Sequence, residues 1–204
     1  MLSADPPDGS ALYDAAVSLR AVVEQRARVQ GDMVLVDDFL NHRVEPAVMR
    51  GVGAELAAAM VGWRPDLVLT AEASGIPPAL VCADALDIPM VYAKKYLGTG
   101  NRYTFSREVM SPTKGVEYRV EVARRVLEPG SRVVVVDDFL AGGRTAEALG
   151  EIAEEAGCDV AGLGFAIEKR WKGGRDRLER HGWVVAALVT IAAIENGAIV
   201  FAAP

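Results

Sequence analysis

The chain has 204 residues, of which 51% are hydrophobic and 25% charged, a composition typical of a packed globular protein and not of a disordered one. A chain of this length suffices for one α/β domain, because it can bury about 70% of its unfolded surface. The net charge of −6 disfavours nonspecific nucleic-acid binding, and the longest apolar run, Val184–Ile194, is too short to span a membrane.

The first part of the chain alternates helical and extended patterns. Apolar residues at a helical period predict an amphipathic helix over Ala11–Gln30. Met33–Leu40 is predicted to be a short extended segment, after which Pro46 begins an alanine-rich helix that ends near Trp63. A buried strand beginning at Asp66, a Ser-Gly turn and a second helix follow.

The same alternation continues in the second part. Ile88–Lys95 is predicted to be a strand, whereas Tyr96–Thr113 lacks a sustained period and predicts a long loop or a mobile hairpin. Tyr118–Leu127 fits either a strand or a helix. Arg132–Leu140 then reads as an all-valine strand, followed by the turn AGGRT and a helix closed by Gly157.

Two more strands, at residues 159–169 and 182–191, complete the predicted elements. Strands that alternate with helices and read as continuous apolar runs indicate a parallel sheet covered on both faces. We therefore predict a doubly wound α/β fold in which residues 1–204 form one domain.

Positive charge gathers in one part of this acidic chain. Residues 94–125 carry eight basic and three acidic side chains, a local net charge of +5. Such a segment suits a small polyanion, and the alternative interpretation is a solvated helix face.

The pentapeptide VDDFL occurs twice, at Val36–Leu40 and at Val136–Leu140. The second copy ends a strand and leads through Ala141–Thr145 into a helix, which is where open α/β sheets bind ligands. The two glycines of this turn allow a phosphate to approach free N–H groups at the start of the helix. Asp137 and Asp138 would then lie near the sugar of the ligand, where two acids suit two ribose hydroxyls.

The turn matches neither GxxxxGK[ST] nor GxGxxG. VVVVDDFLAGGRT instead closely resembles the phosphoribosyl-pyrophosphate (PRPP) signature of type I phosphoribosyltransferases, with Phe139 in place of the usual aliphatic residue. The alternative is a chance strand-loop-helix match with helix-capping acids. The resemblance implies that Asp137 and Asp138 are catalytic residues that hold the ribose hydroxyls. It also implies a phosphate loop for the 5′-phosphate, made of Ala141, Gly142, Gly143, Arg144 and Thr145.

The first copy lacks the glycines and cannot form such a loop. Its surroundings, residues 34–46, resemble the purine-binding hood of bacterial xanthine phosphoribosyltransferases. AEASGIPPA, VYAKK and GFAIEKRWKGGRDRLERHG agree with that subfamily in the same order, so the resemblance runs from about Gly31 to Phe201. It implies a purine phosphoribosyltransferase that makes XMP from xanthine, in which residues 1–46 supply an N-terminal helix and the hood. The pentapeptide match is then a coincidence.

The resemblance also implies a pyrophosphate site. Ser74 and Gly75 would bind pyrophosphate through backbone N–H groups, beside a strained or cis peptide. Lys94 and Lys95 would add positive charge, with Lys95 as a catalytic residue. Mg²⁺ would bridge pyrophosphate and ribose oxygens and be bound mainly through PRPP.

The same resemblance implies that Val34, Asn41 and Lys169 bind the purine. Lysine is a donor only and asparagine is both donor and acceptor, so they suit the exocyclic oxygens of an oxopurine better than the amine of adenine. The loop AGGRT is nevertheless nearer to that of adenine and orotate enzymes. Adenine or hypoxanthine/guanine phosphoribosyltransferases therefore remain alternatives.

Residues 97–114 would close over the site and exclude water. The closing stretch of the subfamily, aromatic-Ser-aromatic-Thr-Lys, stands here as Met110-Ser111-Pro112-Thr113-Lys114. Ser, Thr and Lys are kept and both aromatics are lost. Lys114 is expected to contact PRPP.

A PRPP-sensing transcriptional regulator is the alternative from another class, but the chain is acidic and only about thirty residues precede the hood. The resemblance implies a homodimer whose partners are PRPP and a purine base, with no nucleic acid or membrane. Cys82 and Cys158 form no closely spaced pair, which favours a cytoplasmic, reducing compartment. Residues interpreted as structural are His42, His181, Trp63, Trp183 and Trp171, the last with base stacking as an alternative.

Overall fold

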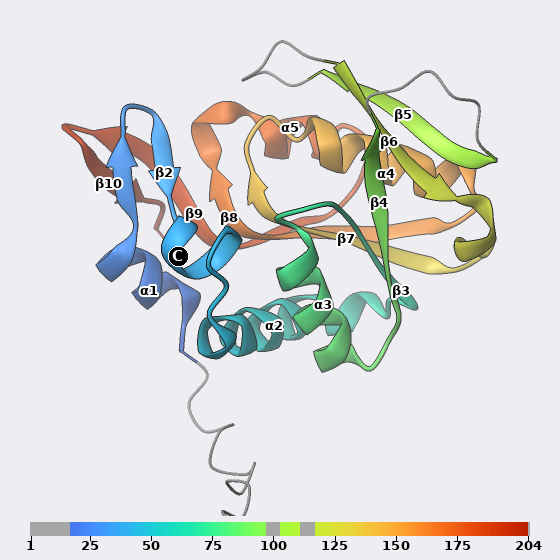
Figure 1. Ribbon diagram of the computed structural model, residues 1–204, viewed down its shortest axis with the longest axis horizontal. Coiled ribbons are helices and arrows are strands. Elements are labelled where there is room, and N and C mark those ends of the chain that lie inside the picture. The colour runs from blue at the N-terminus through green and yellow to red at the C-terminus, as the bar shows by residue number, and fades with distance from the viewer. Residues whose placement is uncertain (1–16, 97–102, 111–116, 204) are drawn as a thin grey trace, which may run out of the picture.

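The computed structural model describes residues 17–96, 103–110 and 117–203. Its main sheet consists of β3 (Leu67–Ala71), β4 (Met90–Tyr96), β5 (Thr104–Met110), β6 (Glu117–Ala123), β7 (Arg132–Leu140), β8 (Asp159–Lys169), β9 (Val185–Glu195) and β10 (Ala198–Phe201). Across the sheet the order is β10-β9-β8-β7-β3-β4-β6-β5 (Figure 1). The strands from β9 to β4 run parallel, and the remaining pairs are antiparallel.

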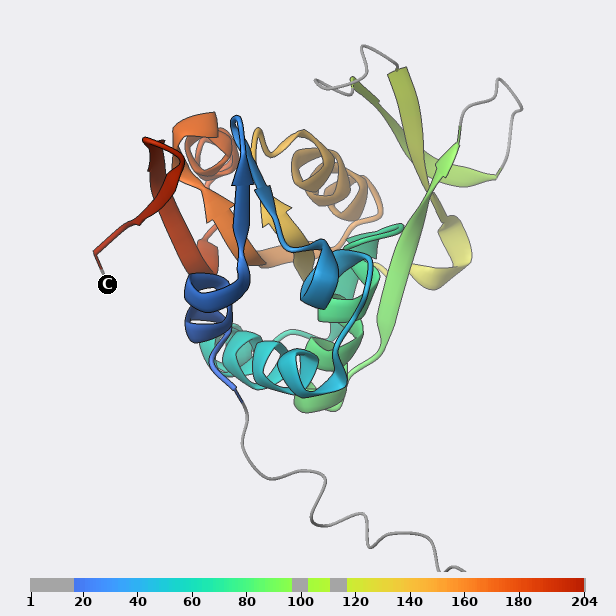
Figure 2. The ribbon, with the colours of Figure 1, turned by 60° about the vertical axis from the view of Figure 1, so that its left-hand side comes forward.

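Helices cover both faces of this sheet. On one face lie α1 (Leu19–Arg26), α2 (Pro46–Met60) and α3 (Ile76–Leu86), and on the other lie α4 (Arg144–Glu155) and α5 (Gly174–Glu179) (Figure 2). Val134 and Val136 of β7 pack into the cluster under α2 and α3, whereas Val133 and Val135 pack into the cluster under α4. Because β7 is buried on both faces, it is a run of valines and not an alternating strand. The doubly wound α/β prediction is confirmed.

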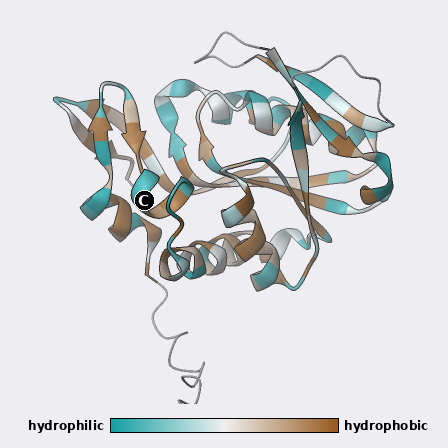
Figure 3. Cartoon of the chain, viewed as in Figure 1, coloured by the Kyte–Doolittle hydropathy of each residue, from teal (hydrophilic) through white to brown (hydrophobic). Residues whose placement is uncertain are grey.

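The hydrophobic residues follow this arrangement. Figure 3 shows hydrophobic colours concentrated along the central strands. Helices α2 and α3 pack closely at Gly53, which has no side chain. A methyl group there would lie only 2.6 Å from the Val81 carbonyl oxygen. Cys82 and Cys158 are both buried and free. Within the described residues no helix is long and apolar enough to cross a membrane.

The predicted helix over Ala11–Gln30 is wrong at its C-terminal end. Helix α1 ends at Arg26, and residues 28–30 form β1 (Arg28–Gln30), which pairs antiparallel with β2 (Met33–Leu35). The turn between them uses Gly31 with φ of 62°. Val29 lies opposite Val34, a β-branched pair that stabilises a strand pair more than a helix. Residues 11–16 lie outside the described residues.

The hood is also less extended than predicted. After β2 the chain turns through one π-helical turn, Asp37–Asn41, so only the start of Met33–Leu40 is a strand. Phe39 in this turn is fully buried. Arg26 reaches it from α1, with its guanidinium 4.9 Å from the Phe39 ring centre and a hydrogen bond of 2.8 Å to Glu45. The hood is thereby attached to the first helix.

The region predicted as a long loop or a hairpin contains a hairpin. Strands β5 and β6 pair antiparallel, with Thr104 opposite Ala123 at one end and Met110 opposite Glu117 at the other. A short helical turn at Arg124–Val126 follows. Arg107 of β5 donates a hydrogen bond of 3.0 Å to Glu151 of α4, which ties the hairpin to the α4 face. Residues 97–102 and 111–116, among them Lys114, lie outside the described residues.

Candidate active site

The predicted site residues meet at one edge of the sheet. The neighbouring strands β8, β7, β3 and β4 are parallel, so their carboxyl ends lie at the same edge. The chain leaves β3 through α3 toward β4 and leaves β7 through α4 toward β8, in opposite directions across the sheet. Ligands of such sheets bind in the crevice at this point, between β3 and β7.

The Asp138 carboxylate connects three segments. Ser74 Oγ, from the turn after β3, donates a hydrogen bond of 3.0 Å to Asp138 Oδ1. Asn41 Nδ2, from the hood, donates one of 3.0 Å to Asp138 Oδ2. Asp138 is 5% exposed, so both bonds form in a largely dry environment. Residues assigned from the sequence to ribose, pyrophosphate and purine thus meet at one carboxylate.

Asp137 precedes Asp138 on β7. Burial raises the pKa of Asp137 well above its usual range, and the charge of Asp138 raises it further, while Lys95 opposes the change. Asp137 Oδ1 accepts a hydrogen bond of 3.0 Å from the backbone N–H of Asp138.

The turn after β3 fits tightly against Asp137. A methyl group at Gly75 would lie 2.4 Å from Asp137 Oδ1 and 2.3 Å from Thr70 Oγ1, so only glycine fits. The Glu72–Ala73 peptide bond, just before this turn, is cis. Glu72 Oε1 accepts a hydrogen bond of 2.6 Å from the backbone N–H of Lys95 and joins the turn to β4.

The structure distinguishes Lys94 from Lys95. Neighbouring residues on a strand point to opposite faces of the sheet. Lys95 Nζ lies 5.5 Å from the centre of the Tyr118 ring, and its charge lowers the pKa of Asp137. Lys94 is in register with Glu121 of β6. Lys95 is therefore the lysine on the side of Asp137.

A cavity of about 150 Å³ lies over the turn after β7. The phosphate loop forms one wall, and Tyr118 of the β5–β6 hairpin contributes to the other. The Tyr118 and Thr145 hydroxyl oxygens are 2.8 Å apart, so the hairpin contacts the loop directly. Gly143, with φ of 75°, precedes α4, and none of the described side chains caps the start of this helix. The backbone N–H groups there suit an anion.

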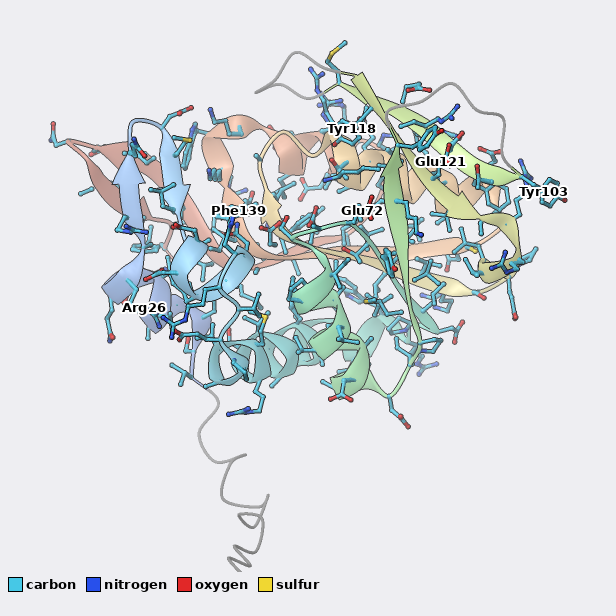
Figure 4. All side chains as sticks on the ribbon, viewed as in Figure 1. Arg26, Glu72, Tyr103, Tyr118, Glu121 and Phe139 are labelled. Atoms are coloured by element: carbon cyan, nitrogen blue, oxygen red, sulfur yellow. The ribbon has the colours of Figure 1, made fainter. Side chains whose placement is uncertain are left out.

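The residues assigned to the purine lie on the hood side of Asp138. Burial lowers the pKa of Lys169, with Lys172 adding to the effect, while the charges of Asp32 and Asp138 oppose it. Lys169 Nζ lies 4.8 Å from the centre of the Phe139 ring. In Figure 4, Phe139 lies on the hood side of the site and Tyr118 on the hairpin side.

Val34 is the one purine candidate that the structure places in the hydrophobic core. It is 5% exposed and belongs to the cluster between the hood and α2. A valine side chain has no hydrogen-bonding group, so any part that Val34 has in purine recognition beside Asn41 and Lys169 falls to apolar contact or to its backbone. Its backbone, paired with Val29 in the β1–β2 ribbon, shapes the hood above them.

Three residues at the site escaped the sequence analysis. Tyr118 lies in a segment whose pattern fits either a strand or a helix, and no sequence pattern marks Glu72 as a contact of β4. Arg177 donates a hydrogen bond of 2.8 Å to the carbonyl oxygen of Gly142 in the phosphate loop. A charged residue on a short helix gives no sequence signal for such a contact.

The remaining polar and aromatic candidates are mainly structural. Trp183 packs over Gly150, and Trp63 packs over Gly162. His181 stacks on Trp183 with ring centres 4.3 Å apart. Trp171 is 37% exposed and lies in the turn after Lys169. Among the described residues no group of three or more His, Cys, Asp or Glu side chains gathers as a metal site.

Comparison with known proteins agrees with this geometry. Residues 40–186 match the sequence model of the phosphoribosyl transferase domain. A xanthine phosphoribosyltransferase of Chloroflexus aurantiacus is 39% identical over 176 residues, which cover 86% of this chain and 83% of that protein. One from Streptococcus pneumoniae is 41% identical over 175 residues, which cover 85% and 91%.

Solved structures of similar fold are adenine phosphoribosyltransferases. The enzyme of Rhodothermus marinus has a TM-score of 0.70 and 25% identity, covering 85% of this chain and 98% of its own. The Giardia lamblia enzyme, solved with 9-deazaadenine, has a TM-score of 0.72 and 20% identity, covering 86% and 99%. The second likeness concerns the fold alone.

Proposed function

The chain belongs to the phosphoribosyltransferase family, and we propose that it converts PRPP and xanthine to XMP and pyrophosphate. The observation that carries this proposal is the meeting of Asn41, Ser74 and Asp138, because one carboxylate joins the segments assigned to base, pyrophosphate and ribose. The relatives named above as xanthine phosphoribosyltransferases support the choice of base.

The proposed reaction is a substitution at C1 of the ribose. A ring nitrogen of the base forms a bond to C1 and gives up its proton, while the bond from C1 to the pyrophosphate oxygen breaks with inversion. Such a step passes through a cationic sugar and needs little covalent help from the protein. The protein has to hold both reactants in line and stabilise the departing charge.

The residues around the crevice fit these tasks. The N–H groups of the phosphate loop would bind the 5′-phosphate, and Asp137 and Asp138 would accept hydrogen bonds from the ribose hydroxyls. Ser74 and Gly75 would bind pyrophosphate, with Lys95 supplying positive charge as it leaves. Lys114 keeps its proposed role at PRPP, and Lys94, on the opposite face of β4 from Lys95, is proposed to add positive charge at longer range.

Mg²⁺ is proposed to arrive with PRPP. Magnesium prefers oxygen ligands and is held through few carboxylates plus substrate phosphates, so the adjacent Asp137 and Asp138 fit it. Bound there, it would supply charge neutralisation for the pyrophosphate. The chain's own contribution is to orient the ribose and to keep water from C1.

Base selection is assigned to Lys169 and Asn41, with Val34 shaping the hood. A charged lysine donates hydrogen bonds to an exocyclic oxygen and repels the amine of adenine. Burial lowers the pKa of Lys169, and a hydrogen bond from its ammonium group to a substrate oxygen would be stronger in such a partly buried place than in water. These properties support xanthine over adenine.

We further propose that residues 1–204 act as one domain in a cytoplasmic homodimer. A surface hollow of about 520 Å³ over β4 and β6 is lined by the exposed side chains of Tyr92 and Val126 together with charged residues such as Lys94 and Arg125. Exposed apolar side chains around a hollow suit a second copy of the chain. The buried, free cysteines suit a reducing compartment.

The test is pyrophosphate release from PRPP and Mg²⁺ with xanthine, guanine, hypoxanthine and adenine supplied separately. Release with xanthine foremost, and its loss in Asp138→Asn, is the expected result. Release with adenine foremost would keep the reaction and contradict the roles of Lys169 and Asn41. No release with any base would turn attention to regulation, tested by a gel shift with purine-operon DNA with and without PRPP.

A further inference from the structure

The back of the phosphate loop is held by α5. A methyl group at Gly174, the first residue of α5, would lie 2.2 Å from the Ala141 carbonyl oxygen and 3.0 Å from the Gly143 nitrogen. The backbone of α5 therefore touches the loop directly. One turn along α5, Arg177 Nε donates its hydrogen bond of 2.8 Å to the Gly142 carbonyl oxygen.

The Arg177 guanidinium is fixed from its other end. Arg177 Nη1 donates a hydrogen bond of 2.9 Å to Glu147 Oε2 on α4, and His181 Nε2 lies 3.1 Å from Glu147 Oε1. Burial alone would raise the pKa of Glu147, but His181 and Arg177 together lower it. Glu147 is therefore charged at neutral pH and orients Arg177 toward the loop.

The hydrogen bond from Arg177 to the Gly142 carbonyl oxygen also orients the next N–H group of the loop, because the peptide unit is planar. In a planar trans peptide the C=O and the following N–H point in opposite directions. A Gly142 carbonyl held toward Arg177 therefore directs the Gly143 N–H away from the Arg177 guanidinium. Glycine at both positions leaves this peptide unit free to rotate, so an external hydrogen bond decides its direction.

We infer that Arg177 is a positioning residue for the 5′-phosphate of PRPP, acting through the Gly142 carbonyl without touching the substrate. The inference rests on the proposed function, because it assigns the loop to that phosphate. It concerns only the phosphate half of PRPP. The pyrophosphate and the base bind to other segments and are independent of Arg177.

Ribose 5-phosphate and pyrophosphate each represent one half of PRPP. Used as probes, they report on the two halves of the site separately. Their affinities for the wild-type protein and for Arg177→Gln are measured by calorimetry, together with KM for PRPP and for xanthine. Arg180→Gln is the matched control, since Arg180 is exposed at the end of α5 and also loses one positive charge. Arg177→Lys keeps the charge and one donor.

We expect Arg177→Gln to weaken ribose 5-phosphate about tenfold and to raise KM for PRPP similarly, the effect of one lost charge-assisted hydrogen bond. Pyrophosphate affinity, KM for xanthine and kcat stay within about twofold, and Arg177→Lys recovers most of the loss. Arg180→Gln behaves as wild type. If Arg177→Gln does not fold, Glu147→Gln replaces it, with an expected weakening of about threefold.

Three results with the Arg177 variants overturn the inference. Arg177→Gln matches Arg180→Gln in ribose 5-phosphate affinity, or it weakens pyrophosphate equally, or Arg177→Lys recovers nothing. A wild-type protein that binds PRPP but not ribose 5-phosphate also contradicts the inference and leaves the proposed function intact. A wild-type protein that binds neither ligand contradicts both.

Discussion

The Asn41 side-chain amide donates a hydrogen bond to Asp138 Oδ2, and the two residues are 97 positions apart in the chain. Ser74 occupies the other oxygen of the same carboxylate. A ribose hydroxyl that bound Asp138, as proposed, would share this carboxylate with both donors or compete with one of them. If the hydroxyl displaced Asn41, the amide would become free to bind the purine, and binding of the sugar would prepare the site for the base.

Asn41→Ala is expected to raise KM for xanthine about tenfold, because a buried purine oxygen or N–H loses its partner. KM for PRPP is expected to stay equal or fall, since Asp138 no longer has the amide as a competing partner. Steady-state kinetics with each substrate varied in turn measure both effects. The control is His42→Ala, an exposed neighbour in the same turn. A parallel rise of both KM values would contradict the competition.

Asp137→Asn is expected to stabilise the fold while it abolishes activity. The pKa of Asp137 is raised in the folded state, so the folded protein binds a proton more tightly than the unfolded chain, and stability is lost as pH rises above about 4. The neutral amide escapes this cost. Tm should increase by about 2–4 °C for each kcal/mol relieved.

Thermal melts of wild type and Asp137→Asn between about pH 5 and pH 8 measure this difference. The difference should grow with pH, because wild type alone loses stability. Asp84→Asn, an exposed change on α3, controls for the substitution itself. A variant that melts below wild type throughout this range would sink the prediction.

Lys169→Met is expected to lower kcat/KM for xanthine by roughly 10- to 100-fold, the loss of a hydrogen bond from a charged donor. Burial lowers the pKa of Lys169, so wild-type activity with xanthine should decline at a lower pH than an ordinary lysine would titrate. Lys169→Arg should move this alkaline limb upward, since arginine stays charged. Lys172→Met, which removes the neighbouring charge that helps lower the pKa of Lys169, should keep kcat/KM for xanthine and move the alkaline limb upward. An unchanged alkaline limb in Lys169→Arg would remove Lys169 from base binding.

Gly142→Ala is expected to raise KM for PRPP about tenfold or more without changing Tm. A methyl group there meets no atom within 4 Å, so the fold tolerates it, but it projects from the phosphate loop that the substrate has to approach. Gly62→Ala, equally unhindered and remote, is the control. Gly75→Ala should instead destabilise the fold by about 1–3 kcal/mol, because its methyl group meets Asp137 and Thr70. Equal KM values for Gly142→Ala and Gly62→Ala would contradict the loop assignment.

The sequence predicted the site residues that stand at the ends of parallel strands. It missed the residues that tertiary contacts bring to the site. Asp138, Ser74 and Lys95 follow apolar runs that read as buried strands, and parallel strands place such ends together. Arg177 and Tyr118 reach the site from a short helix and a hairpin whose positions no local pattern reveals. The helix predicted through Gln30 failed for the same reason, since its last residues pair with β2.

The two copies of VDDFL illustrate how little conformation five residues specify. Val136–Leu140 is part of a strand with parallel neighbours on both sides, whereas Val36–Leu40 includes a π-helical turn that buries Phe39 under Arg26. The same peptide is thus conformationally ambivalent, and its surroundings select the backbone dihedrals. Transferring backbone coordinates between proteins on the strength of such a short identity would therefore mislead here within a single chain.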